Sequence, residues 1–483
     1  MSNPIEGLKP AGVWKWFAEL SKIPRCSKNE AAAAAFVLNT AKKLGLDCQQ
    51  DAVGNVVVRK PASAGREGAP MICLQGHVDM VGEKRPDKVH DFAKDPITLV
   101  RKGNAMMADG TTLGADNGVA VATSLAIMED RTLVHGPLEF LFTIDEEMGL
   151  NGANNLQPGF LKSQTLMNLD SEEEGAVYVG CSGGKDSAGT WKLETDAAPA
   201  GSSALEVKVG GLRGGHSGLE IDKGRGNALK ILNRVVMRIG AIGGRLARID
   251  GGNKRNAIPR DAIALLFVPK AKLADAKAIV AELNATCRAE LATVEPDLQI
   301  TAAASKARGK VFKKGLQKKL TQVMAGLPHG VIKMSADIPE LVETSTNVAV
   351  ITTTKKDVTL ATSQRSSVAS EIVEIADSVR AVFEMGGATV SGSDGYPGWK
   401  PNLNSTILKT AIATYTGLYG KEPHVKAIHA GLECGIIGEK YPGMDMVSFG
   451  PTLEGVHSPD EKIYIDTVEK YWNFLMAILA NVR

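Results

Sequence analysis

Hydrophobic and polar residues in the first part of the chain follow two different periods. Apolar residues recur at helical spacing in residues 14–22 and 29–44, and an Ala-rich helical stretch covers 118–130. Short apolar runs typical of strands occur at 55–59, 71–75, 138–144 and 165–169. The run LEFLFTI is continuous, as in a parallel strand that is buried on both faces. This alternation predicts an α/β domain with a mostly parallel central sheet flanked by helices.

From about residue 185 the pattern changes. Strands are predicted at 205–209, 245–250 and 263–268, and helices at 227–240, 273–292 and 368–385. The segments 347–353 and 358–362 flank KKD and resemble a hairpin. Strand–helix units with antiparallel pairs predict a separate α+β domain inserted as a lid.

The loop SGSDGYPGWKPN is rich in Gly, Pro, Ser and Asn and marks a return to the first domain. A helix at 405–419 and the strand-like run MDMVSFG follow it. For 483 residues, more than one hydrophobic core is expected. We therefore expect a catalytic domain in two segments, 1–184 and 398–483, with a lid domain at 185–397.

Composition narrows the class of protein. The chain is 44% hydrophobic and 23% charged with a net charge of +2, and its basic residues are dispersed, which argues against nucleic-acid binding and a polybasic membrane patch. The start has no secretory signal, and no apolar run is long enough to span a membrane. Six cysteines without a CxxC pair indicate free thiols. We expect a cytoplasmic protein with a small-molecule substrate.

Metal-ligating residue types gather where predicted strands end. The ends of these runs carry His77, Glu146-Glu147 and Asp170, and the loop after MDMVSFG carries His457. Ligands bind at the carboxyl ends of strands in open α/β sheets, so these side chains are expected at one edge. Asp116, in the turn GADNG, is a further candidate ligand. If one of the two glutamates binds metal, the candidate ligands number five.

Two imidazoles and several carboxylates without a thiolate suit zinc, manganese or cobalt. Five protein ligands are too many for one open tetrahedral zinc, but they suit two metals that share a carboxylate. Asp79 can accept the second ring N–H of His77 and fix its tautomer. Of Glu146 and Glu147, one can bind a metal while the other acts as general base.

Each residue taken alone also has a structural explanation. A histidine at a strand end is more often hydrogen-bonded than metal-bound, and Asp116 alone could be a turn or helix-capping residue. A Glu-Glu pair is usually a solvated loop, and Asp170 stands in the acidic helix start DSEEEG. Their joint placement at strand ends favours the metal site.

The motifs QGHVDMV, TTLGADNG, DEEMGLNGA, LMNLDSEEEG, GGHSGLEI, RNAIPR, HAGLECG and GPTLEGVHSPDE, in this order, closely resemble the Xaa-His dipeptidases of the di-zinc metallopeptidase clan that includes carnosinases and aminoacylases. The resemblance covers essentially the whole chain. It implies that Asp116 bridges two zinc ions, that His77 and Asp170 complete one site, and that Glu147 and His457 complete the other. It also implies that Glu146 is the general base and that Asp79 orients His77.

The resemblance further implies substrate-binding residues in the lid. His216 stands among glycines in GGHSG and could stabilise an oxyanion, although a glycine turn with an exposed histidine explains it equally well. Arg365 and Asn256 are similar to residues that hold the substrate's free carboxylate, a task that suits the fork of arginine. A surface arginine is the competing interpretation.

The expected activity is therefore hydrolysis of unblocked dipeptides, including Xaa-His dipeptides such as carnosine, by a homodimer with two divalent ions, zinc or else cobalt or manganese. An aminoacylase or carboxypeptidase-type amidohydrolase with the same metal centre is the nearest alternative. A catalytically silent binding or assembly protein on this scaffold is the alternative from another class. It would need a missing ligand or base, and none is missing.

Overall fold

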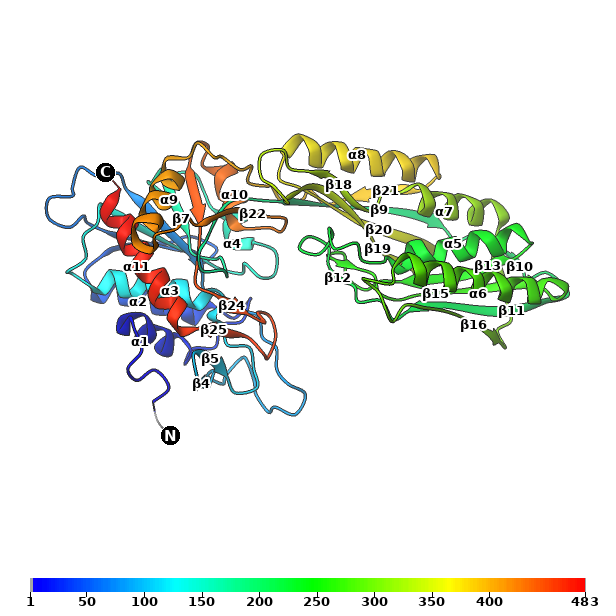
Figure 1. The fold of residues 1–483 in the computed structure, drawn as a ribbon, viewed down its shortest axis with the longest axis horizontal. Helices are drawn as coiled ribbons and strands as arrows, with labels where there is room; N and C mark the ends of the chain where they lie inside the picture. Colours follow the sequence, from blue (N-terminus) through cyan, green and yellow to red (C-terminus); the bar gives the residue numbers. More distant parts are fainter. Residues whose placement is uncertain (1–2, 483) are drawn as a thin grey trace. The chain divides into compact units, whose positions relative to one another are not determined.

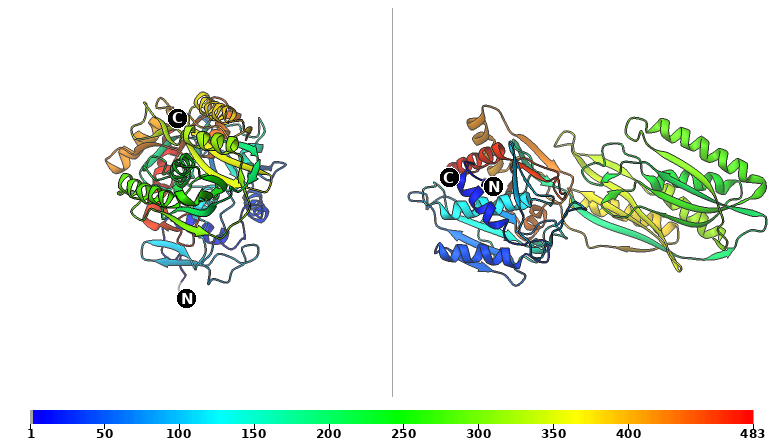
Figure 2. Two further views of the ribbon diagram at one scale, coloured as in Figure 1. Left: turned by 90° about the vertical axis from the view of Figure 1, so that its right-hand side faces the viewer. Right: turned by 90° about the horizontal axis from the view of Figure 1, so that it is seen from below.

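The computed structural model describes residues 3–482 and divides into two compact units. The first unit is formed by Met1–Cys181, Trp399–Ala427 and Leu432–Arg483, and the second by Ser182–Gly398 with Ile428–Gly431. In both Figure 1 and Figure 2, the late segments of the chain (orange and red) lie among the early ones (blue and cyan) of the first unit. The first unit is therefore assembled from sequence on both sides of a long insertion.

The first unit is built on an eight-stranded sheet in the order β1-β2-β6-β3-β7-β23-β8-β22. Its centre is parallel: β3 pairs with β6 and β7, and β7 pairs with β23. The pairs β1–β2, β2–β6 and β23–β8 are antiparallel. The strands are β1 (Asp47–Gln50), β2 (Val56–Lys60), β3 (Ile72–His77), β6 (Leu138–Thr143), β7 (Thr165–Asn168), β8 (Ala176–Cys181), β22 (His424–Ile428) and β23 (Asp445–Ser448).

Helices accompany this sheet, and buried apolar residues explain why. Every residue of β3 and β6 is buried, which matches their continuous apolar runs. Gly76 of β3 allows α3 to approach, since a Cβ there would lie 2.7 Å from the Cβ of Ala120. The helices are α1 (Ala11–Leu20), α2 (Ala31–Lys43), α3 (Ala115–Glu129), α4 (Asn151–Asn155), α9 (Thr406–Tyr419), α10 (Glu433–Lys440) and α11 (Ile465–Asn481). A small sheet joins β4 (Leu99–Lys102), β5 (Ala105–Ala108), β24 (Leu453–Glu454) and β25 (Lys462–Tyr464).

The second unit contains a nine-stranded sheet in the order β16-β11-β15-β13-β19-β20-β9-β21, with β18 paired to β19. Its neighbouring strands pair antiparallel. Its strands are β9 (Gly183–Lys192), β11 (Ser202–Gly210), β13 (Arg245–Gly251), β15 (Ala262–Pro269), β16 (Gln299–Ser305), β18 (Gly330–Met334), β19 (Val342–Thr353), β20 (Asp357–Ser366) and β21 (Thr389–Gly392). Outside it lie the pairs β10 (Thr195–Ala197) with β17 (Lys310–Phe312) and β12 (Gly215–His216) with β14 (Ala257–Ile258).

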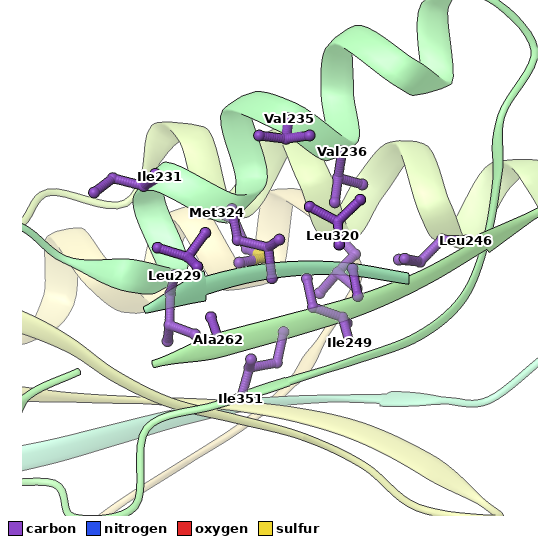
Figure 3. Packing of buried hydrophobic residues seen from close by; sticks show 14 of the residues in the cluster. Leu229, Ile231, Val235, Val236, Leu246, Ile249, Ala262, Leu320, Met324 and Ile351 are labelled. Atoms are coloured by element: carbon purple, nitrogen blue, oxygen red, sulfur yellow. The ribbon is translucent and has the colours of Figure 1, made fainter. Parts of the chain in front are cut away.

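Helices cover one face of this second sheet. They are α5 (Ala228–Ala241), α6 (Leu273–Glu290), α7 (Lys314–Gly326) and α8 (Ala369–Met385). Apolar strand residues meet these helices: Leu246 and Ile249 of β13, which share a face because the strand has an irregularity between them, pack with Val236 of α5 and Leu320 of α7 (Figure 3). On β20 the opposite face carries polar side chains, among them Arg365.

The predicted fold class is confirmed: an α/β unit with helices around its sheet and an inserted α+β unit. Parallel pairing joins the four central strands of the first sheet, β6, β3, β7 and β23. The hairpin predicted around KKD is confirmed as β19 and β20. Among residues 3–482, no helix is both long and apolar enough to cross a membrane.

Candidate metal centre and substrate-binding residues

Five predicted ligands converge in the first unit. His77, Asp116 and Asp170 can each direct one donor atom to a common point, and so can Asp116, Glu147 and His457, with donor atoms within 4.8 Å of one another in each group. Asp116 belongs to both groups. A third group combines His77 with Glu146 and Glu147. The donors are nitrogen and oxygen atoms throughout, which suits zinc, cobalt or manganese.

Asp116 lies between the two histidines. Its Oδ1 is 3.2 Å from Nε2 of His77, and its Oδ2 is 3.1 Å from Nε2 of His457. Burial would raise the pKa of Asp116, but hydrogen bonds from the two imidazoles hold it far below its ordinary value. Hydrogen bonds to Asp116 and Glu147 raise the pKa of His457 to about 11. Without metal, imidazolium charges therefore neutralise the carboxylates.

Asp79 connects His77 to the loop that carries the two glutamates. Its Oδ1 is 3.3 Å from Nδ1 of His77 and accepts the backbone N–H of Glu146 at 3.1 Å, while Oδ2 accepts the backbone N–H of Glu147 at 3.3 Å. Burial opposes ionisation of Asp79, but the hydrogen bond with His77 and the charge of that ring lower its pKa to about 2. Asp79 is thus an anion placed to accept the second ring N–H of His77.

Glu146 is half-buried and gathers negative neighbours. Burial raises its pKa well above the ordinary value; the charge of His77 opposes this, while Asp170, Glu433 and Glu147 add to it. Burial likewise raises the pKa of Asp170 to about 6. A carboxylate with a raised pKa beside a metal site is the type of group that accepts a proton near neutral pH.

The loop that carries Asp116 is held by two buried charged residues that the sequence did not reveal. Glu461, 2% exposed, accepts four backbone N–H groups, of residues 113, 114, 115 and 116, at 2.7, 3.0, 2.8 and 3.3 Å. Arg25, also 2% exposed, donates to the carbonyls of Val78 and Asp79, each at 2.9 Å, and to the carbonyl of Gly114. We call Arg25 and Glu461 the loop clamp. It ties the loop of His77 to the loop of Asp116.

A buried polar network lies behind the centre. Gln75, two residues before the end of β3, and Thr143, the last residue of β6, each donate to Oε2 of Glu433 at 2.6 Å. Asn168 donates to Oε1 of Gln75 at 2.6 Å. All four side chains are fully buried, so the strand ends that bear the ligands are joined by hydrogen bonds as well as by backbone pairing.

The other three predicted site residues lie together in the second unit. Nη2 of Arg365 is 3.5 Å from Nε2 of His216, and Nη1 of Arg365 donates to the hydroxyl of Tyr396 at 3.1 Å. Asn256 precedes β14, and the side chain of Asn347 donates to the carbonyls on either side of it, those of Arg255 and Ala257, at 3.3 and 2.8 Å. Asn256, Arg365 and Tyr396 line one cavity.

The backbone selects the tautomer of His216. Its Nδ1 accepts the N–H groups of Gly218 and Leu219 at 3.3 and 3.2 Å, so a neutral ring carries its proton on Nε2. Nε2–H and the guanidinium of Arg365 are then two donors that lie side by side. Such an arrangement suits an anionic or carbonyl oxygen placed between them.

An α/β fold whose strand ends bring together two donor groups with a shared carboxylate defines a metal-dependent hydrolase of the two-metal type. A family model agrees: residues 73–481 match "Peptidase family M20/M25/M40", and the chain belongs to this family. Family membership and the shared donor groups together imply a centre for two metal ions.

Relatives match over the whole chain. The chain is 40% identical over 482 residues to the cytosol non-specific dipeptidase of Escherichia coli (strain K12), covering 99% of both chains. The crystal structure of aminoacylhistidine dipeptidase from Vibrio alginolyticus matches with a TM-score of 0.90 and 40% identity, over 100% of this chain and 99% of that one. Aminopeptidase PepT from Bacillus cereus shares the fold at 16% identity, with a TM-score of 0.57 over 98% and 99% of the two chains.

Proposed function

We propose that this protein is a dipeptidase that uses two divalent ions, zinc or else cobalt or manganese, to hydrolyse the peptide bond of unblocked dipeptides, including Xaa-His dipeptides such as carnosine. The observation that carries the proposal is the pair of donor groups that share Asp116. The identity of 40% over 99% of the chain to a dipeptidase supports the substrate class. By the same likeness we propose a cytoplasmic location, and we further propose that the protein is a homodimer.

We assign the ligands from the two groups of donors. His77 and Asp170 would hold one ion, Glu147 and His457 would hold the other, and Asp116, which belongs to both groups, would serve both ions. Asp79 orients His77 through its second ring nitrogen, 3.3 Å away. The remaining carboxylate of the glutamate pair, Glu146, is left for proton transfer. Ions at these positions would lower the pKa of a water and polarise the scissile carbonyl.

Glu146 carries out the proton transfers in this scheme. It takes a proton from the attacking water, whose oxygen forms the new bond to the carbonyl carbon. When the carbon–nitrogen bond breaks, Glu146 gives that proton to the leaving amine. The negative charges near Glu146, those of Asp170, Glu433 and Glu147, favour the first transfer because they make its carboxylate a stronger base.

The second unit supplies substrate contacts in this proposal. Nε2–H of His216 donates to the developing oxyanion, and Arg365 and Asn256 hold the free carboxylate of the substrate. The two hydrogen bonds of Asn347 to the backbone around Asn256 support this role, since they fix the backbone at Asn256.

A substrate panel tests the proposal. Purified protein is stripped with a chelator and reloaded with zinc, cobalt or manganese, then assayed with carnosine, Ala-His, Ala-Leu, a tripeptide and N-acetylated amino acids. We expect no activity after chelation, recovery with metal, about two ions per chain, and cleavage of free dipeptides. Cleavage of acetylated amino acids alone would assign an aminoacylase instead. No hydrolysis of any substrate by the metal-loaded protein would favour a binding or assembly protein.

A further inference from the structure

A polar cavity of about 460 Å³ lies in the second unit, beside the Arg365–Tyr396 pair. Its lining includes Gly184, Asp186, Asn256, Ser363, Arg365 and Tyr396. Among the described residues that line it, none is Ala, Val, Leu, Ile or Met. A cavity that already contains the proposed carboxylate-binding arginine is the natural place for the rest of the same substrate residue.

The register of two strands orders this cavity. On the sheet face away from the helices, Arg365 of β20 stands opposite Gly184 of β9, and Ser363 stands opposite Asp186. Asp186 is therefore the diagonal neighbour of Arg365, about 7–8 Å away along the sheet.

Gly184 leaves space for the aromatic ring of Tyr396 at one side of the cavity. A Cβ at Gly184 would lie 2.5 Å from ring atoms of Tyr396, so the ring occupies the space that any other residue at 184 would fill. The flat ring thus borders the path between Arg365 and Asp186. Aromatic faces stack well on planar side chains such as imidazole.

Asp186 provides the only carboxylate among the described lining residues. It is paired with Arg255 at 3.0 Å, but the side chains of the two residues are 28% and 58% exposed. Such a solvent-exposed ion pair contributes little, so the carboxylate can accept a second donor without a large penalty. Ser363 and Ser393 add hydroxyl groups nearby. Lys185 and Arg255 also line the cavity, so Asp186 is the part of the lining that suits a planar side chain that donates hydrogen bonds.

We propose that Asp186 is a specificity-determining residue, which accepts a hydrogen bond from the side chain of the C-terminal substrate residue and favours histidine there. This inference rests on the proposed dipeptidase function. The carboxylate of that residue lies at Arg365, its imidazole lies along Tyr396, and a ring N–H reaches Asp186.

The test is discrimination between substrates by the full-length, metal-loaded enzyme. We measure the ratio of kcat/KM for Ala-His to that for Ala-Leu in the unmodified protein, in Asp186→Asn and in Asp275→Asn, an exposed aspartate of α6 in the same unit. Asp186→Asn should lower the ratio about tenfold, mainly through KM for Ala-His, and Asp275→Asn should leave it unchanged. Asp186→Glu, which keeps the charge, should restore part of the preference.

Each outcome of these measurements either supports or overturns the role of Asp186. An unchanged ratio in Asp186→Asn, or an equal loss for both substrates, overturns the assignment of Asp186. If Asp186→Asn is poorly folded, Asp186→Glu together with Ala-Glu as substrate decides instead: the preference for Ala-His over Ala-Glu should persist in Asp186→Glu, and its absence in the unmodified enzyme overturns the inference. Failure of the unmodified, metal-loaded enzyme to cleave Ala-Leu and Ala-His would overturn the dipeptidase proposal itself, which is a different result.

Discussion

Glu461 offers the sharpest prediction, because one buried carboxylate accepts four backbone N–H groups of the loop that carries Asp116. In Glu461→Gln, the amide oxygen can still accept two of these four hydrogen bonds. The amide NH₂ is a donor and faces the other two N–H groups, so those two hydrogen bonds are lost. Hydrogen bonds to charged groups contribute about 1.5–3 kcal/mol each, so the loss of two predicts about 3–6 kcal/mol of destabilisation. For a domain stable by about 5–15 kcal/mol, this is a large fraction.

The assay is urea unfolding of the metal-free protein followed by tryptophan fluorescence. Four of the five tryptophans lie in the first unit, so the signal mainly reports on the unit that contains Glu461: Trp14, Trp16, Trp399 and Trp472, against Trp191 in the second. The matched control is Glu454→Gln, an exposed glutamate seven residues earlier that pairs with Lys462 at the surface.

A second readout is metal affinity. Loss of a residue that hydrogen-bonds to metal ligands and holds them in place typically weakens metal binding about 10–100-fold. When Glu461→Gln is titrated with zinc, its zinc affinity should be reduced by a factor in this range. The reasoning is refuted if Glu461→Gln is no less stable than Glu454→Gln and binds zinc as tightly as the unmodified protein.

Three further predictions concern the site. Glu146→Gln should keep both metals but lose about 10²-fold or more in kcat, whereas Glu147→Gln should lose metal, as metal analysis and Ala-His hydrolysis will show. Arg365→Ala should raise KM strongly for free dipeptides and hardly affect dipeptide amides. The raised pKa of His457 means that its protonated ring stabilises the metal-free protein fully below pH 6.5 and that this contribution is lost as the pH rises through about 11. The Tm of the metal-free protein should therefore fall over this interval, and it should fall less in His457→Gln.

Contrary results would be clear in each case. Metal loss in Glu146→Gln with retention in Glu147→Gln would exchange the roles of base and ligand. Equal slowing of amides and free dipeptides by Arg365→Ala would place the carboxylate contact elsewhere, for example at Asn256. A metal-free Tm that rises between pH 6.5 and 10 relative to His457→Gln would contradict the stabilising pairing of His457 with Asp116 and Glu147.

Sequence patterns predicted the centre of the first unit well because buried parallel strands have a strong signature. β3 and β6 are continuous apolar runs, and their ends carry His77 and, one loop later, Glu146 and Glu147. β9 was not predicted, since GGKDSAGTWK is rich in glycine and charge and becomes a strand only because β20 and β21 pair with it. Its glycines look like a loop in the sequence and are instead sites of close approach.

The loop clamp and Tyr396 were missed for a different reason. Arg25 and Glu461 are single charged residues in loops, and such residues are usually solvated. Only the fold places them against backbone groups that are 53 to 348 positions distant along the chain. The signal that could have pointed to Glu461 is its position four residues after His457, within GPTLEGVHSPDE.

The insertion of the second unit has a consequence for synthesis of the chain. β23 lies between β7 and β8, so the first sheet cannot be completed until Asp445–Ser448 has been made, whereas nearly all of the second unit has left the ribosome earlier. Trp399 exchanges two backbone hydrogen bonds of 2.9 Å with Cys181, which places the entry and exit of the insertion side by side. If the second unit folds first, it brings these ends together and replaces a loop of more than two hundred residues by a short closure, which reduces the entropy that β23 must overcome to reach its partners.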